Sequence, residues 1–367
     1  QHDEVRPVMV EDVRDAVEDS ADAAGGVWSP RTTVAASLVM GSALFLVLAA
    51  VRYARPELLG TNASGHLVSA LVAVAALLAM AAWARYFSES WVVQVAIAVA
   101  MVWGYIVGLS LGELAGLDGP VTLMVAMALA ALVAGGARGI TVAGTGHAAA
   151  GVVLLVAAVA VGAAELSDVD VDQVYRVLPV LGLLVTGVIP RLSLSVGGLA
   201  SADYRVRHVG RMSLGTLRSR FRQSNAILVG ALTGIGLVVV WACLHLTFGE
   251  DPWDRYLALG LGLAALLRSR VYSRTHHMVP LRTVGVAVLA LQLVRLCADV
   301  DALGAWVTAI LVGAVVLAVG VSTLPMSVIT RARVKRILNI VEFLVVIELI
   351  VLVFGATGVI AKLGGLV

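Results

Sequence analysis

The sequence predicts an all-α integral membrane protein with eleven transmembrane helices, a cytoplasmic N-terminus and an extracytoplasmic C-terminus. Three observations support this fold class. Hydrophobic residues make up 60% of the 367 positions and charged residues only 14%, so lipid rather than water must solvate most of the chain. The hydrophobic residues gather in eleven stretches, most of them near the roughly 20 residues that a spanning helix needs. The gaps between these stretches alternate between arginine-rich and acidic segments.

The first predicted element, residues 1–32, is an acidic cytosolic linker helix. Pro7 suits a first helical turn, valines follow at helical spacing, and Gly25-Gly26 can end the helix. We expect either a stalk that joins a cytosolic domain to the first span, a contact for a basic partner, or an ordinary solvated helix. The chain starts at Gln1 without an initiator Met or a signal peptide, so we expect further sequence before it.

Transmembrane helices 1–6 are predicted within residues 33–190. Each is an apolar run that ends at or near a charged residue or a proline, and the fourth is short. Their predicted bounds are 33–53, 67–84, 92–111, 121–137, 146–164 and 174–190.

Residues 191–224 form a predicted basic cytoplasmic loop. In its second half Leu214, Leu217 and Phe221 share a rough helical face with arginines around it. Nothing breaks this pattern before the next span, so we expect a helix that protrudes into the cytoplasm. Transmembrane helices 7–11 follow within residues 225–367, at 225–247, 256–267, 283–298, 305–324 and 340–360; the eighth is short.

The orientation follows from the side on which basic residues gather, because cytoplasmic loops carry an excess of Lys and Arg. With the N-terminus inside, nearly all arginines of the short loops fall on the cytoplasmic side. The opposite loops are acidic; they contain Glu57, Glu113, Asp118, Glu165, Asp168, Asp170, Asp172, Glu250, Asp251, Asp254, Asp299 and Asp301.

Some cytoplasmic loops are more basic than orientation requires. Such residues suit acidic surfaces of partner proteins, or phospholipid headgroups. The candidate docking residues are Arg205, Arg207, Arg211, Arg218, Arg220, Arg222, Arg268, Arg270, Arg274, Arg331, Arg333, Lys335 and Arg336.

Four polar residues are candidate contacts inside the membrane. Glu348 lies roughly 12 Å into the last span at 1.5 Å per residue, where a carboxylate is costly. It is either a proton-relay group or a protonated or paired residue that faces another helix. Glu342 can reach the membrane edge or pair with the basic cluster on its own helix. Arg295 can snorkel outward or pair four residues on, and Gln292 suits a hydrogen bond between helices.

Gly230 and Gly234 form a small-xxx-small pattern that favours close helix packing. The sequence contains no serine triad, phosphate-binding loop or metal-binding cluster. Gly144-Thr145-Gly146 lacks the Lys-Ser/Thr ending of a phosphate-binding loop and begins a predicted span. We therefore expect no enzyme activity, no cofactor and no bound metal.

At its basic loops the chain resembles the EccD family, the eleven-span membrane subunit of the type VII (ESX) secretion system of mycobacteria and related actinobacteria. Three stretches carry the resemblance: PRLSLSVGGL at 190–199, RSRVYSR at 268–274 continuing through PLRTVGVAVLALQLVRLC to Cys297, and RARVKRILNIVEFL at 331–344 with a proline at 325. Family members carry an N-terminal ubiquitin-like cytosolic domain, which we expect in the sequence before Gln1.

The resemblance implies a non-enzymatic scaffold in the inner membrane. It implies a dimer of two EccD-like copies around a lipid-filled enclosure, within a larger six-fold assembly. Its implied partners are EccB-like, EccC-like ATPase and EccE-like subunits, together with phospholipids. Nucleic acid is not an expected partner. The alternative from the residues alone is a proton-coupled secondary transporter with a site near the membrane midplane around Glu348.

Overall fold

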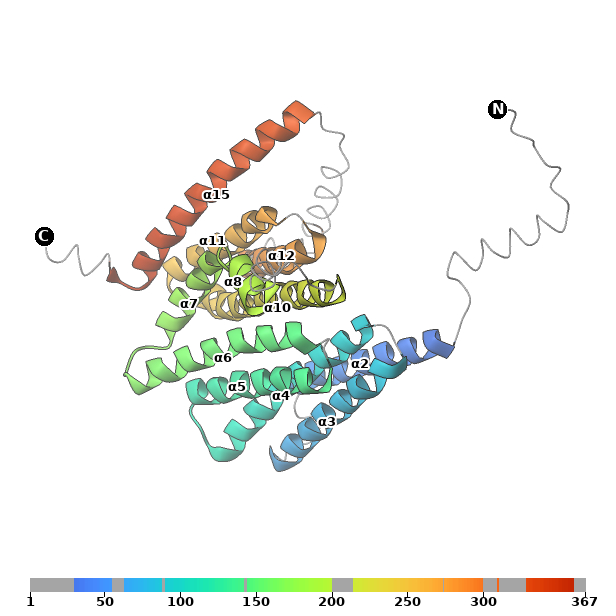
Figure 1. Ribbon diagram of the computed structural model, residues 1–367. Coiled ribbons are helices and arrows are strands. Elements are labelled where there is room, and N and C mark those ends of the chain that lie inside the picture. Colours follow the sequence, from blue (N-terminus) through green and yellow to red (C-terminus); the bar gives the residue numbers. More distant parts are fainter. Residues whose placement is uncertain are drawn as a thin grey trace, which may run out of the picture.

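The computed structural model describes residues 30–54, 63–87, 90–141, 144–199, 214–272, 274–299, 309 and 328–359, and all regular structure in these ranges is helical (Figure 1). The predicted linker helix before residue 30 lies outside them. The helices are α2 (Pro30–Ala54), α3 (Ala63–Phe87), α4 (Ser90–Ala115), α5 (Gly119–Ile140), α6 (Thr145–Leu166), α7 (Asp172–Val185), α8 (Ile189–Val196), α10 (Leu214–Phe248), α11 (Pro252–Arg268), the 3-10 turn η3 (Ser269–Val271), α12 (Thr275–Asp299) and α15 (Val328–Ala356).

Among the described residues, seven helices are long and apolar enough to cross a membrane, or eight if the bent pair α7–α8 counts as one span. The other predicted spans do not meet that length within this part of the chain. The described apolar part of the first covers Ser37–Ala49, the eighth corresponds to the 17-residue α11, and nearly all of 305–324 lies outside the description. The protein is therefore a multi-pass membrane protein, and the count of eleven and the orientation stay predictions.

The helices form two groups in space. Helices α2–α6 lie together, each of α3–α6 packed against its neighbour in sequence, and α7–α15 form the second group (Figure 1). In the first group Leu77 and Trp103 are buried, and the indole Nε1 of Trp103 donates a hydrogen bond of 3.0 Å to the carbonyl of Phe45. This bond ties α4 to α2.

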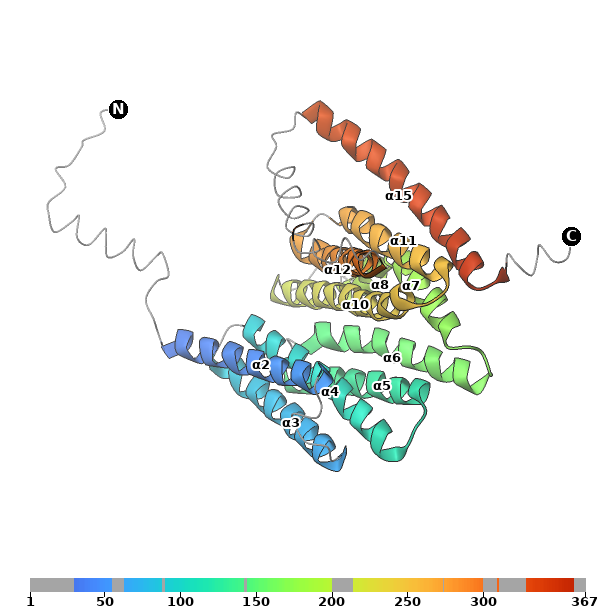
Figure 2. The ribbon, with the colours of Figure 1, turned by 180° about the vertical axis from the view of Figure 1, so that it is seen from behind.

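The second group surrounds a leucine-rich core from α10, α11, α12 and α15. Leu232, Leu257, Leu281 and Leu349 are almost completely buried there. Helix α15 packs mainly on α11 and lies at the edge of the group away from α2–α6, as both views show (Figures 1 and 2). Burial of these side chains against one another fixes the positions of four helices.

A close crossing of α6 and α10 joins the two groups. A Cβ atom placed on Gly230 would collide with the backbone of Gly146, and one placed on Gly234 would lie 2.9 Å from the carbonyl oxygen of Ala150. Only glycine allows the two backbones to approach this closely.

The predicted sixth span, 174–190, is not one continuous helix in the structure. Helix α7 ends at Val185, α8 begins at Ile189, and the two axes differ by 69°. The cause lies in the sequence: Pro190 stands in the first turn of α8, where its missing N–H costs no hydrogen bond. The apolar run hides this start signal because its hydrophobicity continues through the break.

Two other boundaries follow from local chemistry. Helix α11 begins at Pro252, four residues before the predicted span, because the Asp251 carboxylate accepts a hydrogen bond of 2.9 Å from the N–H of Trp253. Helix α10 has 35 residues without a break. At 1.5 Å per residue it is about 52 Å long, well beyond a hydrocarbon core of about 30 Å.

Candidate functional site

Four residues at or near the predicted cytoplasmic ends of their helices meet at one end of the second group. We call Thr186, Arg268, Tyr272 and Glu342 the inner polar cluster. Arg268 stands at the C-terminus of α11, where a positive charge is favourable. Its Nε donates a hydrogen bond of 3.0 Å to the Thr186 hydroxyl, and its Nη1 lies 3.3 Å from Oε1 of Glu342 on α15. The cluster therefore ties α7, α11 and α15 together.

The same cluster satisfies the backbone at the helix break. The Tyr272 hydroxyl donates a hydrogen bond of 2.8 Å to the carbonyl of Thr186. The carbonyl of the fully buried Thr186 needs such a partner, because water cannot reach it. Burial raises the pKa of the Tyr272 hydroxyl, so the group stays protonated and keeps its role as a donor.

The structure thus gives Arg268 and Glu342 contacts that the sequence did not connect. Arg268 was a candidate docking residue, but its guanidinium makes intramolecular contacts and only 26% of its side chain is exposed. Glu342 was expected to snorkel or to pair with the basic residues of its own helix; it pairs with Arg268 of α11.

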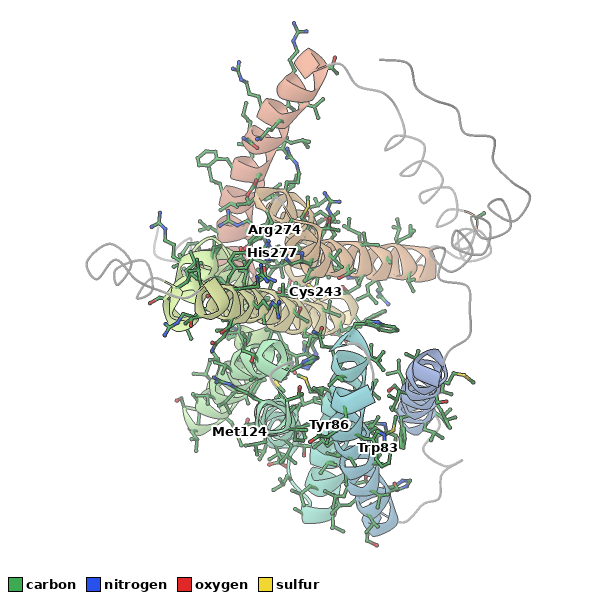
Figure 3. All side chains as sticks on the ribbon, turned by 45° about the vertical axis from the view of Figure 1, so that its right-hand side comes forward. Trp83, Tyr86, Met124, Cys243, Arg274 and His277 are labelled. Carbon is green, nitrogen blue, oxygen red and sulfur yellow. The ribbon has the colours of Figure 1, made fainter. Side chains whose placement is uncertain are left out.

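The basic residues around the inner polar cluster fall into two sets. One set contacts the protein itself: Arg220 donates a hydrogen bond of 2.7 Å to the carbonyl of Gly198, and the Arg274 guanidinium lies 5.2 Å from the centre of the Phe221 ring. Figure 3 shows Arg274 with His277 at the start of α12. The other set is exposed at the ends of α10 and α15; it comprises Arg218, Arg222, Arg333, Lys335 and Arg336.

The remaining docking candidates are placed as follows. Arg270 lies in η3 and is partly exposed. Arg331 belongs to α15, and nothing is described of its side chain. Arg205, Arg207 and Arg211 lie outside the described residues. The described docking candidates therefore lie on α10, on η3, just before α12 and on α15, at helix ends on the predicted cytoplasmic side.

A second cluster lies at the opposite end of the same helices. The guanidinium of Arg176 on α7 donates two hydrogen bonds, of 2.7 and 2.9 Å, to the Asp254 carboxylate of α11. The two side chains are only 12% and 8% exposed. Beside them, Nε2 of His245 lies 2.9 Å from Oδ1 of Asp172, and the His245 ring stacks on Tyr175. We call these five residues the outer polar cluster.

Sequence reasoning missed the outer polar cluster and treated its members as separate loop charges. Arg176 and Asp254 are 78 positions apart, so spacing gives no hint of their contact. The available signal was compositional: Arg176 is one of the few arginines on the acidic side. An isolated basic residue among acidic loops needs a carboxylate partner once it is buried.

The polar residues inside the membrane differ in their surroundings. The Gln292 amide donates a hydrogen bond of 2.8 Å to the Thr247 hydroxyl, which links α12 to α10. Arg295 is partly exposed on α12 and has a polar contact. Glu348 lies on the exposed face of α15, between the exposed apolar residues Ile347 and Ile350.

These contacts fit a structural element better than a catalytic centre. The two clusters join helices through charge-assisted hydrogen bonds at both ends of the second group. Within the described part of the chain, no three His, Cys, Asp or Glu side chains are grouped to hold a metal ion. What the arrangement offers to other molecules is an exposed basic end and long apolar faces.

Comparisons with known proteins agree with this fold. A family model described as EccD-like transmembrane domain matches residues 32–366. None of the curated proteins matches the chain.

Two solved structures are similar. The first is described as protomer 1 of the ESX-3 core complex, with a TM-score of 0.67, 22% identity, and coverage of 97% of this chain and 80% of that chain. The second is described as a MycP5-free ESX-5 inner membrane complex, State II, with a TM-score of 0.56, 18% identity, and coverage of 88% of this chain and 78% of that chain. At these identities the likeness is one of fold.

Proposed function

Because the chain belongs to the EccD family, we propose that it is a non-enzymatic scaffold subunit of a type VII secretion complex in the inner membrane. The observation that supports this most directly is the distribution of polar groups. Two ion pairs of largely buried side chains, Arg176–Asp254 and Arg268–Glu342, lie at the two ends of the second group. The helix faces between the ends are apolar except at Glu348 and Arg295, as expected of a protein that holds others in place rather than lining an aqueous path.

The exposed basic end is the proposed docking surface for cytosolic partner domains, an EccC-like ATPase among them. Arg218, Arg222, Arg333, Lys335 and Arg336 remain exposed there. The internal contacts of Arg268 leave it less suited to docking, although the sequence alone included it. A cluster of exposed arginines favours acidic protein surfaces and speeds encounter with them.

Charge reversal tests this docking surface. We expect the pair Arg333→Glu and Lys335→Glu to reduce co-purified ATPase at least tenfold, since like charges across an interface cost several kcal/mol. Both residues are exposed, so the chain itself should stay folded and elute as before. Glu165→Lys, an exposed charge reversal at the opposite end, is the matched control. Unchanged co-purification with the double variant would show that this surface does not dock the partner.

We also propose that two copies of the chain face each other and enclose lipid, beside EccB-like and EccE-like subunits in a six-fold assembly. In support, α15 exposes Phe343, Leu344 and Val351, with exposed fractions of 65%, 56% and 50%. α3 likewise exposes Val68 and Val72. Apolar faces of this extent require lipid or protein cover. The mass of the purified protein in mild detergent, with its retained lipid, tests this; a lipid-free monomer would contradict it.

The alternative, a proton-coupled transporter, gains no support from the geometry. It needs Glu348 in an enclosed site near the midplane. In the described part of the chain Glu348 instead lies on the outer face of α15, and it does not line the cavity between α6, α7, α8 and α10. We therefore do not propose transport.

A further inference from the structure

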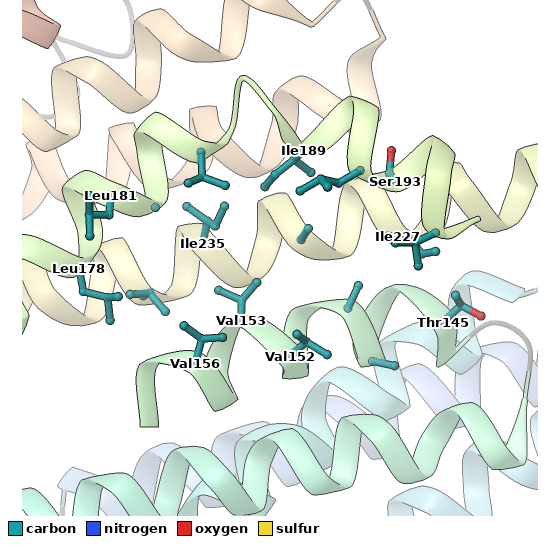
Figure 4. Close-up of a pocket in the computed structure, with 18 of the residues that line it drawn as sticks. Thr145, Val152, Val153, Val156, Leu178, Leu181, Ile189, Ser193, Ile227 and Ile235 are labelled. Atoms are coloured by element: carbon teal, nitrogen blue, oxygen red, sulfur yellow. The ribbon is translucent and has the colours of Figure 1, made fainter. Parts of the chain in front are cut away.

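An apolar groove runs between α6, α7–α8 and α10, with a cavity volume of about 680 Å³ (Figure 4). Helix α10 forms its floor through Ile227, Ala231 and Ile235. Val152 and Val156 of α6 form one wall. The other wall comes from α7 and α8, on either side of the helix break. The volume falls in the usual range of about 300–1,000 Å³ for a site that binds a small ligand.

The groove opens onto the lipid-facing surface. Val152, Val156 and Leu181 line it and yet are 61%, 55% and 52% exposed. All its apolar lining side chains are aliphatic or proline. A mobile hydrocarbon chain can fill such a trough, whereas a site for a rigid ring would use aromatic walls.

One end of the groove is polar. Thr145 and Ser193 lie at this end, while Leu178 and Leu181 lie at the other (Figure 4). Arg138, an exposed residue in the last turn of α5, also lines the groove. It is the one charged residue in the described lining. The polar end therefore carries a net positive charge.

The groove is long enough to hold an acyl chain of one leaflet. Its floor extends from Gln223 to Val238, fifteen positions on one helix. At 1.5 Å per residue this is about 22 Å, compared with about 15 Å for half of the hydrocarbon core. The polar end is the one predicted to be cytoplasmic, so an inner-leaflet lipid would enter with its headgroup toward Arg138.

The fold explains why the space exists. The glycine crossing holds α6 against α10, whereas α7 contacts α6 at few positions and bends by 69° into α8. The bend separates the two walls above the floor. The groove therefore stays open, although α6 and α10 pack closely beneath it.

We propose that this groove binds one anionic phospholipid, with an acyl chain along α10 and the phosphate beside Arg138. Basic pockets between transmembrane helices on the cytoplasmic side are typical sites for anionic headgroups. All the residues that line this site belong to one copy of the chain. It therefore stands whether or not the chain dimerises.

Native mass spectrometry of the full-length protein in mild detergent tests the site. Phosphatidylglycerol and phosphatidylcholine with identical chains are added at equal concentration. We expect one retained lipid and about a fivefold preference for phosphatidylglycerol, as one arginine near an anionic headgroup supplies. Arg138→Gln should abolish the preference while a lipid is still retained.

Two variants block the groove. Val152→Trp, from the α6 wall, and Leu181→Trp, from the α7 wall, should each reduce retained phosphatidylglycerol at least tenfold. Both positions are about half exposed or more, so we expect both variants to fold. The two walls also provide independent tests, because one variant is enough if the other fails to fold. The matched control is Val159→Trp, a 62% exposed position of α6 outside the groove, which should retain lipid normally.

Three outcomes would overturn the proposal. One is equal lipid retention by Val152→Trp and Val159→Trp. Another is a lack of headgroup preference in the unmodified protein. The third is capture of a protein chain rather than lipid by a photo-crosslinker at Val152 in the native complex, which would assign the groove to a partner helix.

Discussion

Single residues stabilise this protein mainly at the two ends of the second group. In the inner polar cluster, Arg268 and Tyr272 hydrogen-bond to Thr186 at the break between α7 and α8. In the outer polar cluster, Arg176 and Asp254 join α7 to α11. A buried ion pair adds little over apolar packing, but the loss of one partner leaves a charge without compensation. Both clusters therefore matter most when one partner is removed.

The Arg176–Asp254 pair gives the clearest prediction at this scale. Arg176→Gln leaves the buried Asp254 carboxylate unpaired, so unfolding in detergent should require about 3–5 kcal/mol less. The exposed Arg222→Gln is the control and should change little. Replacement of both Arg176 and Asp254 by leucine should recover much of the loss. A single variant as stable as the control would show that the pair is not needed.

Glu348 gives a functional prediction. Since it lies on the exposed face of α15, Glu348→Gln should leave assembly intact and secretion within about twofold, because Gln keeps the shape of the side chain and removes only its acid group. Secretion from cells that carry the variant, with the co-purified subunits measured in parallel, provides the readout. Loss of secretion with an intact complex would revive the proton-relay interpretation.

At the scale of elements, the contact between α6 and α10 depends on small residues. The α6–α10 crossing allows no Cβ at Gly230, because the atom in its way belongs to the backbone of Gly146 and cannot move aside. The same crossing joins the two groups of helices and holds the floor of the groove in place.

Gly230→Ala should therefore separate α6 from α10. We expect a loss of about 1–3 kcal/mol, the usual cost of overpacking, seen as a lower unfolding temperature in detergent. Gly135→Ala on α5 is the matched control, because a Cβ there meets no atom within 4 Å. Equal unfolding temperatures for the two variants would contradict this account of the crossing.

The sequence predicted these elements unevenly, for physical reasons. Apolar length was enough to find the helices, and the periodic pattern from Leu214 ran unbroken into the seventh span, as α10 does. The break after Val185 was missed although Pro190 marks it, because hydrophobicity continues across it. The ion pairs and the groove depend on which helices become neighbours, and no local pattern in one sequence encodes that.

The whole molecule is best understood as an apolar frame with a basic end. Its interior charges are largely paired, its faces suit lipid or helices, and its exposed arginines suit acidic partner domains. Membership in the EccD family connects these properties to secretion. The proposed function therefore lies in assembly, with the chemistry supplied by a partner.

Affinity purification of the tagged chain from native membranes in mild detergent, followed by identification and mass measurement of the complex, tests this claim most directly. The account predicts that a second copy of the chain, an ATPase subunit and further membrane subunits elute together with it. Elution of the folded chain alone, as a monomer, would contradict it.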